Sequence, residues 1–394
     1  MHVPVAIVGA GPSGSLLAWI LRQRGIESIV LESRSREYVE GRIRAGVMEQ
    51  NAVDLMVRAG IGDRLMKERY YHNGVGIGYK NEHHFINFDE LIGIGVTVYG
   101  QSEVTKDLLG GLANEGHTVL YEAPVTSIED HHTNTPKVKY TQDGVEKELT
   151  ADFVIGCDGF HGASRKSIPE SDIITHEKVY PFGWLGILCK SPPMLDVALF
   201  AHHPNGFALV SMRSETISRL YLQCAPDEDV SKWTDEMIWD ELDVRVGTDE
   251  FKVNRCEIFE KDVAPLRSFF SEPMRYGNMF LAGDASHIVP PTGAKGLNSA
   301  FADISVLSAG LIRHFKNDDS SILEEYAEVA LRRNLLTQRF SWTNTAMYHI
   351  FPGSSSFDRR MQESQIETLI TDELTQTVYA KAHTGLPFAY WPEL

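Results

Sequence analysis

A glycine-rich segment near the amino terminus is the feature that most constrains the fold. Residues 3–32, VPVAIVGAGPSGSLLAWILRQRGIESIVLE, predict a strand, a glycine turn, a helix and a second strand that ends at an acid. Gly9, Gly11 and Gly14 follow the apolar strand residues with the spacing G-x-G-x-x-G. This combination is typical of a βαβ unit that binds a dinucleotide, so we expect a parallel sheet covered by helices.

Each part of this segment has its own physical role. Gly9 permits a tight turn, Gly11 lets the backbone approach a pyrophosphate, and Gly14 lets the helix pack closely on the strand. The free amide groups and the positive dipole end of the helix that begins at Pro12 would face the phosphates. Glu32 lies 21 positions after Gly11, where its carboxylate can accept hydrogen bonds from ribose hydroxyls. A glycine triplet alone is more often a simple turn, but here a strand, a helix and an acid accompany it.

The negative net charge of the chain limits the kinds of molecule that it is expected to bind. The chain has 394 residues, enough for about two or three domains, and a formal net charge of −17. This charge disfavours nucleic acid and anionic membranes as partners, so anionic ligands must be held by local basic clusters. No apolar stretch reaches the ~18 residues that cross a bilayer, and the amino terminus lacks the basic start of a secretion signal. We therefore expect a cytoplasmic enzyme.

The cysteines do not indicate a metal site or a disulfide framework. Cys157, Cys189, Cys224 and Cys256 are far apart in the sequence and form no C-x-x-C pair. We expect free thiols and no bound metal.

Two later segments resemble further nucleotide-binding elements. Residues 149–165 predict a strand at 152–156, followed by Asp158 in a turn. Residues 278–311 predict a strand at 279–282, followed by Asp284, a proline-containing loop and a long helix from about Gly296. Each aspartate–glycine pair alone usually marks only a turn, so their meaning depends on the other segments.

Together the three segments resemble the class A flavoprotein aromatic hydroxylases, in which G-x-G-x-x-G precedes a middle D-G and a late G-D with P-P-x-G. The chain is similar in more detail to the para-hydroxybenzoate hydroxylase family. The matching segments are GRIRAGVMEQ (41–50), VTVYGQSEVTKDL (96–108), GCDGFHGASR (156–165), YPFGWLGIL (180–188), APLRSF (264–269) and LAGDASHIVPPTGAKGLN (281–298). They span nearly the whole chain, which is therefore identified as a member of this family.

The resemblance implies an α/β (α+β) fold. A Rossmann-like FAD-binding domain of the glutathione-reductase type would carry an inserted strand-rich substrate domain and a helical C-terminal part, and the protein would form a homodimer. The expected boundaries are 1–71, 97–175 and 266–345 for the discontinuous FAD domain, 72–96 and 176–265 for the substrate domain, and 346–394 for the helical C-terminal region.

The resemblance also implies an activity. An FAD-dependent monooxygenase would use NADPH or NADH and O2 to hydroxylate a para-substituted benzoate next to its para group, through a flavin C4a-hydroperoxide. The first candidate substrate is 4-hydroxybenzoate, which would give 3,4-dihydroxybenzoate. A flavin-binding protein on the same scaffold without monooxygenase activity is an alternative of a different class. A halogenase is disfavoured because the sequence has no W-x-W-x-I-P segment.

Most of the implied site residues would bind the cofactor. Asp284 would hold the ribityl chain, and the helix from Gly296 would direct its positive end at the pyrimidine side of the isoalloxazine. The implied FAD-binding residues are Gly9, Gly11, Gly14, Glu32, Arg42, Arg44, Gln101, Asp158, Arg219, Asp284, Lys295, Gly296, Leu297 and Asn298.

The nicotinamide cofactor has no second glycine fingerprint in this sequence. In the resembled family it binds transiently near residues 33–44, where arginines offer cations for its phosphates. Arg36 is expected to lie only on a solvated helix face. Ser33 and Arg34 depart from the pattern of strict NADPH users, so the coenzyme preference stays open. The implied NAD(P)H-binding residues are Arg34, Tyr38, Arg42, His161, Arg165 and Arg267.

The resemblance places a carboxylate clamp at Ser211, Arg213 and Tyr221, in which a guanidinium fork binds two oxygens and two hydroxyls complete the hydrogen bonds. Without the family match, alternating arginine and tyrosine on a strand often form only an exposed face. The backbone carbonyl of Pro291 and the loop through Thr292 would shape the oxygen-transfer step.

The sequence departs from the family at the para end of the substrate. Typical members have two tyrosines there, which remove the phenolic proton of the substrate. Phe200 and His383 occupy these two positions, His72 remains as the outer member of the relay, and Ala198 replaces a larger aliphatic residue.

Two explanations of these departures stay open. Either His383 and His72 rebuild a proton path through water, or the substrate needs no such deprotonation because its para group already donates electrons. An amino group would do this, so 4-aminobenzoate is a close alternative to 4-hydroxybenzoate, and a larger dihydroxybenzoate could use the space beside Ala198. The departures are instead without consequence if the local alignment slips by one residue, or if Tyr379 or Tyr390 returns a hydroxyl to the site.

Overall fold

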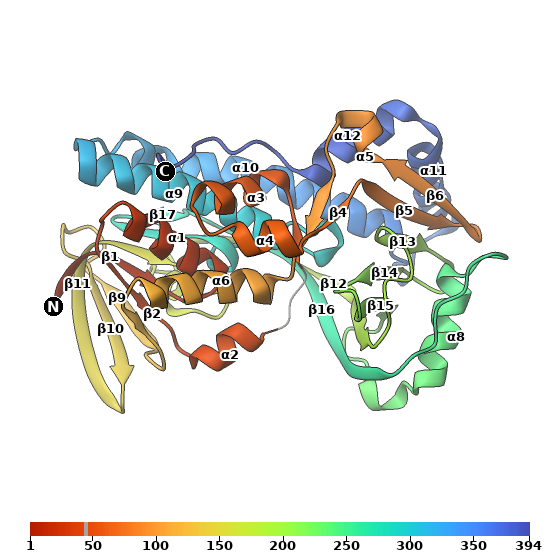
Figure 1. Ribbon diagram of the computed structural model, residues 1–394, viewed down its shortest axis with the longest axis horizontal. Coiled ribbons are helices and arrows are strands. Elements are labelled where there is room, and N and C mark those ends of the chain that lie inside the picture. The colour runs from red at the N-terminus through yellow and green to blue at the C-terminus, as the bar shows by residue number, and fades with distance from the viewer. Residues whose placement is uncertain (43–45) are drawn as a thin grey trace.

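The computed structural model describes residues 1–42 and 46–394 and has two lobes side by side (Figure 1). One lobe is built on a sheet that contains the parallel strands of the glycine-rich segment. The other is built on a second, largely antiparallel sheet. Helices cover both lobes and dominate the C-terminal part, which confirms the predicted fold class.

The first sheet brings three distant parts of the chain together. The central strand β1 pairs in parallel with both β11 and β2, and β11 pairs in parallel with β18. The order is β17 (Arg275–Tyr276), β18 (Met279–Leu281), β11 (Val145–Gly156), β1 (His2–Val8), β2 (Ser28–Leu31) and β8 (Val119–Leu120), with β10 (Lys137–Gln142) joining β11 to β9 (Val125–Glu129). The strand expected at 152–156 is the end of the longer β11, and the one expected at 279–282 ends one residue earlier.

The period of two along β1 explains how this sheet is buried. Val5 and Ile7 face a core formed with the helices α1 (Pro12–Gln23), α6 (Gln101–Asn114) and α9 (Gly296–Asn317). Ala6 and Val8 face a second core on the opposite side, toward β9 and β10. Burial on both faces fixes the register of β1 and hence the position of the glycine turn at its end.

The second sheet forms the other lobe. Its order is β19 (His287–Ile288), β16 (Ile258–Glu272), β12 (Ile174–Cys189), β15 (Ser218–Cys224), β14 (Ala208–Met212), β13 (Leu199–His202), β5 (Gly74–Tyr79) and β6 (Glu82–Asn87). One face packs on α8 (Asp235–Val246), and the other packs its aromatic side chains against the C-terminal helices. A small third sheet has the order β3 (Val47–Met48), β7 (Val96–Val98) and β4 (Tyr70–His72).

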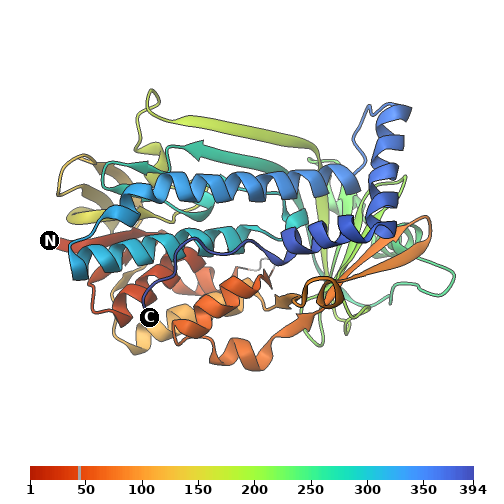
Figure 2. The same cartoon turned by 90° about the horizontal axis from the view of Figure 1, so that it is seen from above.

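The longest helix runs along both lobes. It is α10 (Ser321–Tyr348), and it lies beside α9 in one lobe and reaches the second sheet in the other (Figure 2). The remaining helices are α2 (Arg36–Gly41), α3 (Gln50–Arg58), α4 (Asp63–Glu68), α5 (Phe88–Ile92), α7 (Ala163–Lys166), α11 (Ser356–Thr371) and α12 (Glu373–Thr384). Short 3-10 turns lie at Val230–Lys232, Gly283–Ala285 and Pro291–Gly293.

After α12 the chain returns as an irregular segment along the first lobe (Figures 1 and 2). Arg333 donates to the carbonyl oxygens of Leu386 at 2.7 Å and Pro387 at 2.8 Å, and Tyr390 donates to Glu325 at 2.6 Å. Residues 385–394 are thus not helical, in contrast to the helical region expected for 346–394. The other expected domain boundaries stay a prediction. Strand β16 runs across the expected boundary between the substrate and FAD domains at 265/266.

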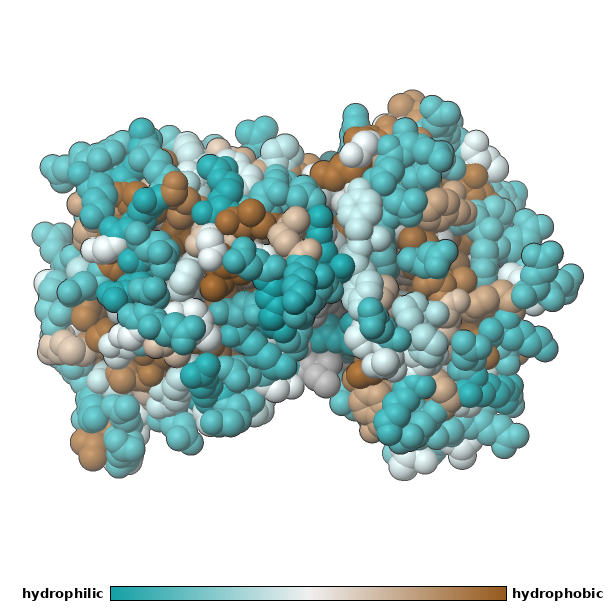
Figure 3. Space-filling view, viewed as in Figure 1, coloured by the Kyte–Doolittle hydropathy of each residue, from teal (hydrophilic) through white to brown (hydrophobic). Residues whose placement is uncertain are grey.

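The surface is largely polar and is notched between the two lobes (Figure 3). No helix within residues 1–42 and 46–394 is both long enough and apolar enough to span a bilayer.

Candidate active site

The glycine turn forms a cradle with one open side. A side-chain carbon on Gly9, which has φ 101°, would lie 2.5 Å from the carbonyl oxygen of Cys157, and one on Gly14 would lie 2.0 Å from the carbonyl oxygen of Gly9. The same carbon on Gly11 would meet no atom within 4 Å. Gly11 therefore presents its backbone to open space at the amino terminus of α1, where Pro12 starts the helix without needing an amide partner.

Glu32 lies beside this cradle at the end of β2. Its carboxylate accepts hydrogen bonds from the backbone amides of Ala10 and Arg34, both at 2.8 Å. These bonds hold the buried acid next to the turn. Each carboxylate oxygen has further lone pairs with which to accept a hydroxyl.

The sheet places the two later segments next to the first. The amide of Cys157 donates to the carbonyl of Val8 at 2.7 Å, and the amide of Ala282 donates to that of Gly156 at 2.9 Å. The ends of β1, β11 and β18 thus lie side by side, so that Gly9, Asp158 and Asp284 all follow neighbouring strand ends. Ligands bind at such carboxyl edges in open α/β sheets.

Only one of the two carboxylate oxygens of Asp158 accepts hydrogen bonds from the described residues. Its Oδ2 accepts from the amide of Ser164 at 2.9 Å and from its hydroxyl at 3.0 Å. Oδ1 is buried and has no hydrogen-bond partner among the described residues. Burial raises the pKa of this carboxyl group.

The loop that carries Asp284 is anchored by a buried ion pair. Asp303 on α9 accepts from the amide of Gly283 at 2.9 Å and lies 2.7 Å from His287 Nε2. Burial acts to lower the pKa of His287, but the charge and hydrogen bond of Asp303 outweigh it, so the pKa is raised. Further along, Pro291 and Thr292 form a 3-10 turn, and the Thr292 hydroxyl lies 3.0 Å from that of Thr345 on α10.

At the amino terminus of α9, two predicted cofactor residues bind protein groups. Lys295 Nζ donates to Glu49 Oε1 and to the carbonyl of His383, both at 2.7 Å. The side chain of Asn298 accepts from the amide of Glu49 at 2.8 Å and donates to the carbonyl of Val47 at 2.9 Å. Burial lowers the pKa of Lys295, and Glu49 opposes this shift.

Gly296 and Leu297 begin the helix just beyond this pair. A side-chain carbon on Gly296 would meet nothing within 4 Å, whereas Leu297 is half-buried against the core. The start of α9 thus has an open side like that of the glycine turn.

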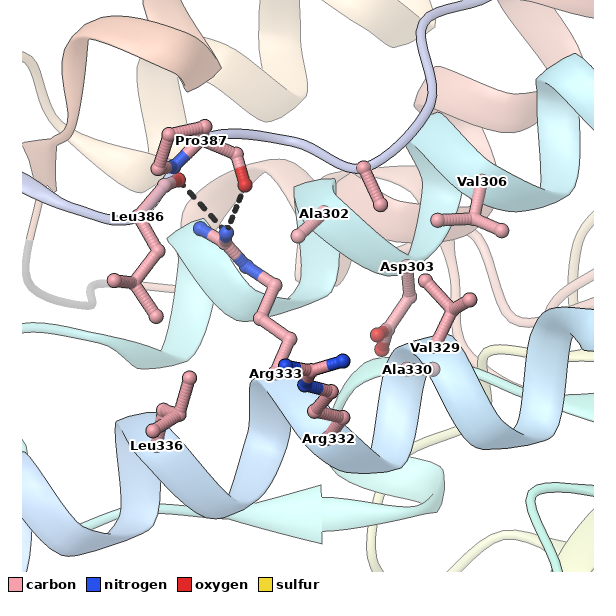
Figure 4. Close-up of a pocket in the computed structure, with 11 residues that line it drawn as sticks. Ala302, Asp303, Val306, Val329, Ala330, Arg332, Arg333, Leu336, Leu386 and Pro387 are labelled. Carbon is pink, nitrogen blue, oxygen red and sulfur yellow. Dashed lines mark hydrogen bonds between the residues drawn. The ribbon is translucent and has the colours of Figure 1, made fainter.

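Sequence reasoning missed Glu49 and Arg333, which complete this network. Arg333 Nη2 lies 3.4 Å from Glu49 Oε2, and its other nitrogen binds the C-terminal segment (Figure 4). Arg333 also lines a pocket of about 300 Å3 between α9, α10 and that segment. Glu49 does lie within the family-like segment 41–50, so an acid in that segment was the available signal.

The register of β14 and β15 assembles the predicted clamp. Ser211 pairs with Arg219, and Leu209 pairs with Tyr221, so these side chains share one face of the sheet. The Ser211 hydroxyl donates to the carbonyl of Arg219 at 3.0 Å.

Arg213 lies two residues further along the same strand direction. Its Nη2 donates to the hydroxyl of Ser102 at 3.0 Å, at the start of α6 next to the predicted cofactor residue Gln101. A side-chain carbon on Gly100 would lie 2.8 Å from the same nitrogen. Burial and then the neighbouring Arg219 lower the pKa of Arg213, which still remains a cation. Two adjacent guanidinium groups are an environment that favours a carboxylate.

Arg219 has an unused donor. Its guanidinium lies 5.1 Å from the centre of the Tyr221 ring, and Nη1 is buried without a hydrogen-bond partner among the described residues. A buried donor of this kind fits an acceptor on a bound group.

Three of the predicted NAD(P)H residues converge on one aromatic ring. The guanidinium groups of Arg165 and Arg267 lie 4.8 Å and 4.6 Å from the centre of Phe160, and the His161 ring lies 5.0 Å from it. Arg267 is also paired with Glu177 at 3.1 Å.

The other predicted NAD(P)H residues lie in or next to α2. Arg34 lies 5.3 Å from the Tyr38 ring, and both Arg42 and Tyr38 are exposed. Arg36 is half-buried and is paired with Glu40 at 2.7 Å on α2, and its lack of a binding role stays a prediction. Arg44 lies outside the described residues.

In the part of the site predicted to hold the para group of the substrate, His72 and His383 do not contact each other directly. His72 Nε2 lies 3.3 Å from Met212 Sδ, and burial lowers the His72 pKa to about 4. His383 lies on α12 with its ring 6.2 Å from that of Phe200. Burial, followed by the charge of Lys295, lowers its pKa to about 3. A direct proton path between the two histidines is therefore not formed.

Of the two further tyrosines considered, only Tyr379 lies here. Its ring is 5.6 Å from that of His383, whereas Tyr390 binds Glu325 at the chain end. Ala198 is half-buried against the same aromatic core as Phe200.

These features fit FAD as the bound group. The open sides of Gly11 and Gly296 leave room for phosphates and a ring system, and the orphaned Asp158 Oδ1 and Arg219 Nη1 offer an acceptor and a donor.

The comparisons agree with this fit. The FAD binding domain family matches residues 2–341. A p-nitrophenol 4-monooxygenase from Pseudomonas putida DLL-E4 has the same fold, with a TM-score of 0.82 at 18% identity over 98% of this chain and 99% of that chain. Fold, site and family together define an FAD-dependent aromatic monooxygenase that uses NAD(P)H as co-substrate.

Sequence relatives narrow the class. The p-hydroxybenzoate hydroxylase of Acinetobacter baylyi is 43% identical over 98% of this chain and 96% of its own length. A 3-amino-4-hydroxybenzoate 2-monooxygenase from Streptomyces cremeus is 23% identical, with 93% of both chains covered. The chain belongs to the p-hydroxybenzoate hydroxylase family of FAD-binding monooxygenases.

Proposed function

We propose that this protein hydroxylates a para-substituted benzoate at the ring carbon next to the para group, with one oxygen atom from O2. The observation that carries the proposal is Arg213, which lies beside Arg219 on the same sheet face as Ser211 and Tyr221. The name of the relative from Acinetobacter baylyi supports 4-hydroxybenzoate as one candidate substrate.

In this proposal the substrate carboxylate binds at Arg213, with the hydroxyls of Ser211 and Tyr221 completing its hydrogen bonds. Two residues along a strand span about 7 Å, comparable to the length of a benzoate with its two ring substituents. A ring anchored at Arg213 and Ser211 would thus direct its para group toward Leu209 and Phe200, which are paired across β14 and β13.

Bound FAD would supply the reduction of O2 and the transfer of one oxygen atom to the ring. The amino terminus of α1 at Gly11 would hold its pyrophosphate, Glu32 and Asp284 would hold its ribose and ribityl hydroxyls, and Asp158 would offer a further acceptor. Arg219 would support the ring system. The buried aromatic wall of the second sheet would exclude water from the reacting ring. The Thr292–Thr345 contact would fix the loop that brings the Pro291 carbonyl toward the substrate.

A second candidate, 4-aminobenzoate, is favoured by a specific observation. Phe200 has no hydroxyl, and His72 and His383 do not contact each other directly, so these side chains form no direct route for a phenolic proton. The use of NADH or NADPH and the homodimer both stay predictions.

The test measures aromatic product against NAD(P)H consumed, for 4-hydroxybenzoate and 4-aminobenzoate with the FAD-loaded protein. We expect at least one compound to give close to one product per NAD(P)H, with benzoate-stimulated cofactor oxidation. Fast NAD(P)H oxidation without product from both compounds would refute the proposal.

A further inference from the structure

Two buried tyrosine hydroxyls lie close together, near Phe200 and His383, which replace the two tyrosines typical of the family. Tyr348 is the last residue of α10 and Tyr379 lies on α12, and their hydroxyl oxygens are 3.3 Å apart. Tyr348 is 0% and Tyr379 8% exposed. A pair of polar groups this deep in an aromatic core is costly unless it makes hydrogen bonds.

The sheet register relates this pair to Arg213. Phe207, Leu209, Ser211 and Arg213 alternate along one face of the segment that contains β14, with Arg213 at one end. The Tyr348 ring lies 6.2 Å from Phe207, at the opposite end, and 5.7 Å from Phe200. The tyrosine pair is therefore on the side of the clamp to which a bound benzoate would direct its para group.

His383 adds a third polar group to this end. Its ring lies between those of Tyr379 and Phe200, at 5.6 Å and 6.2 Å, and also contacts Phe88 and Phe340. Nδ1 is buried without a hydrogen-bond partner among the described residues. The imidazole is 4% exposed, so this unpaired nitrogen can accept a hydrogen bond from a bound molecule or donate one to it.

The three groups are electrically neutral. Burial lowers the pKa of His383 to about 3 and raises that of Tyr379 to about 12, and it also raises that of Tyr348. Among the described residues, the charge that acts on the His383 pKa is the Lys295 ammonium, which is bound to Glu49 and to the His383 carbonyl and disfavours a second cation. These groups therefore accept and donate hydrogen bonds but do not take up a proton readily.

We propose that Tyr348, Tyr379 and His383 form the subsite for the para substituent of the substrate, and that this subsite selects an amino group over a hydroxyl group. The inference rests on the proposed function. An aromatic amine has two N–H groups and can donate two hydrogen bonds. The imidazole lone pair and a tyrosine oxygen can accept them. A phenol has one donor, and it becomes a strong electron donor only after it loses its proton to a base.

The reaction balances without such a base. The substrate, O2, NAD(P)H and one proton give 4-amino-3-hydroxybenzoate, NAD(P)+ and water. One oxygen atom forms the new bond at ring carbon 3, from which the hydrogen leaves as a proton. The other oxygen atom leaves as water with the two electrons of NAD(P)H.

The test compares kcat/KM for product formation from 4-aminobenzoate and 4-hydroxybenzoate. The FAD-loaded wild type is set against Tyr348→Phe and Tyr379→Phe, with Tyr390→Phe as a control that removes a hydroxyl at the chain end. We expect the wild type to prefer the amine by about tenfold. Each core variant should reduce that preference by about fivefold, the size expected for one hydrogen bond, and the control should leave it unchanged.

A wild type that prefers 4-hydroxybenzoate, or variants with an unchanged ratio, would overturn this inference and leave the proposed function intact. No product from either compound would instead refute the proposed function.

A spectroscopic measurement tests the same inference on the wild type alone. Difference absorbance of 4-hydroxybenzoate bound to the wild type should show the neutral phenol at neutral pH, and a phenolate spectrum there would overturn the inference.

Discussion

Lys295 and Glu49 form a fully buried ion pair at the start of the helix that would face the flavin. Their charged atoms are 2.7 Å apart, and each side chain is 4% exposed. The same ammonium donates to the carbonyl of His383, so one cation joins α9, the segment before α3 and the end of α12. The pair therefore links the predicted cofactor residues at the start of α9 to the predicted substrate residue His383.

Replacing Glu49 by glutamine should destabilise the protein, because it leaves the Lys295 ammonium buried without a counter-charge. We expect a loss of about 3 kcal/mol in the free energy of unfolding, measured by urea denaturation of the FAD-loaded protein. The double variant Glu49→Gln with Lys295→Met should recover part of this loss, since the Lys295 ammonium is then no longer buried without a counter-charge. A loss below about 0.5 kcal/mol for the single variant would contradict the role of the pair.

Alanine at two fingerprint glycines should separate folding from cofactor binding. Gly14→Ala forces a carbon to within 2.0 Å of the Gly9 carbonyl, so it should destabilise the apoprotein by about 3 kcal/mol. Gly11→Ala meets no protein atom and keeps an allowed backbone, with φ −64°, so the apoprotein should remain stable.

The same Gly11→Ala carbon would enter the space assigned to the pyrophosphate. FAD titration followed by flavin fluorescence should therefore show affinity weakened by at least about tenfold, or 1.4 kcal/mol. Unchanged FAD affinity in this variant would show that the phosphates do not lie at Gly11.

Arg213→Gln should weaken benzoate binding more than it affects folding. The variant removes the proposed charged partner of the substrate carboxylate, a loss of about 1.5–3 kcal/mol, or roughly 10- to 100-fold in Kd. Ser211→Ala is the matched control, with a smaller effect, because its hydroxyl is shared with the Arg219 carbonyl. Binding is measured by the absorbance change of the flavin, and equal Kd values for wild type and Arg213→Gln would exclude this clamp.

The ion pair of His287 and Asp303 should make stability depend on pH. The pKa of His287 is raised in the folded protein, so its stabilising contribution is fully present below the unfolded value of about 6.5. The contribution is lost as pH rises through the folded pKa. Urea denaturation of wild type and His287→Gln between pH 6 and pH 9 should therefore show a difference in stability that narrows with increasing pH; a difference that widens would contradict the charged pair.

The sequence was sufficient for the parts of the fold that local patterns encode. The apolar run Val5–Val8, the glycine spacing and the proline at the helix start predicted a strand and a helix where β1 and α1 lie, although β1 begins three residues earlier, at His2. The three cofactor segments were predicted because each has a strand followed by a glycine–aspartate or glycine motif, and the sheet places their ends together. These features depend on residues close in the chain.

The rest of the site depends on contacts between distant residues. Lys295 and Glu49 are 246 positions apart, and neither neighbourhood signals that the lysine binds an acid and a carbonyl of the protein. The pairing of Tyr348 with Tyr379 needs the packing of α10 on α12, which helical periodicity alone does not specify. Family resemblance identified Phe200 and His383 as unusual, but only the coordinates show which polar groups surround them.

The most direct test of the central claim uses heavy-isotope dioxygen. The FAD-loaded protein is given NAD(P)H and either 4-aminobenzoate or 4-hydroxybenzoate, and mass spectrometry measures the label in the product. The account predicts one labelled oxygen atom in a ring hydroxyl, and loss of this product in Arg213→Gln. Product without the label, or NAD(P)H oxidation that yields only hydrogen peroxide with both compounds, would contradict it.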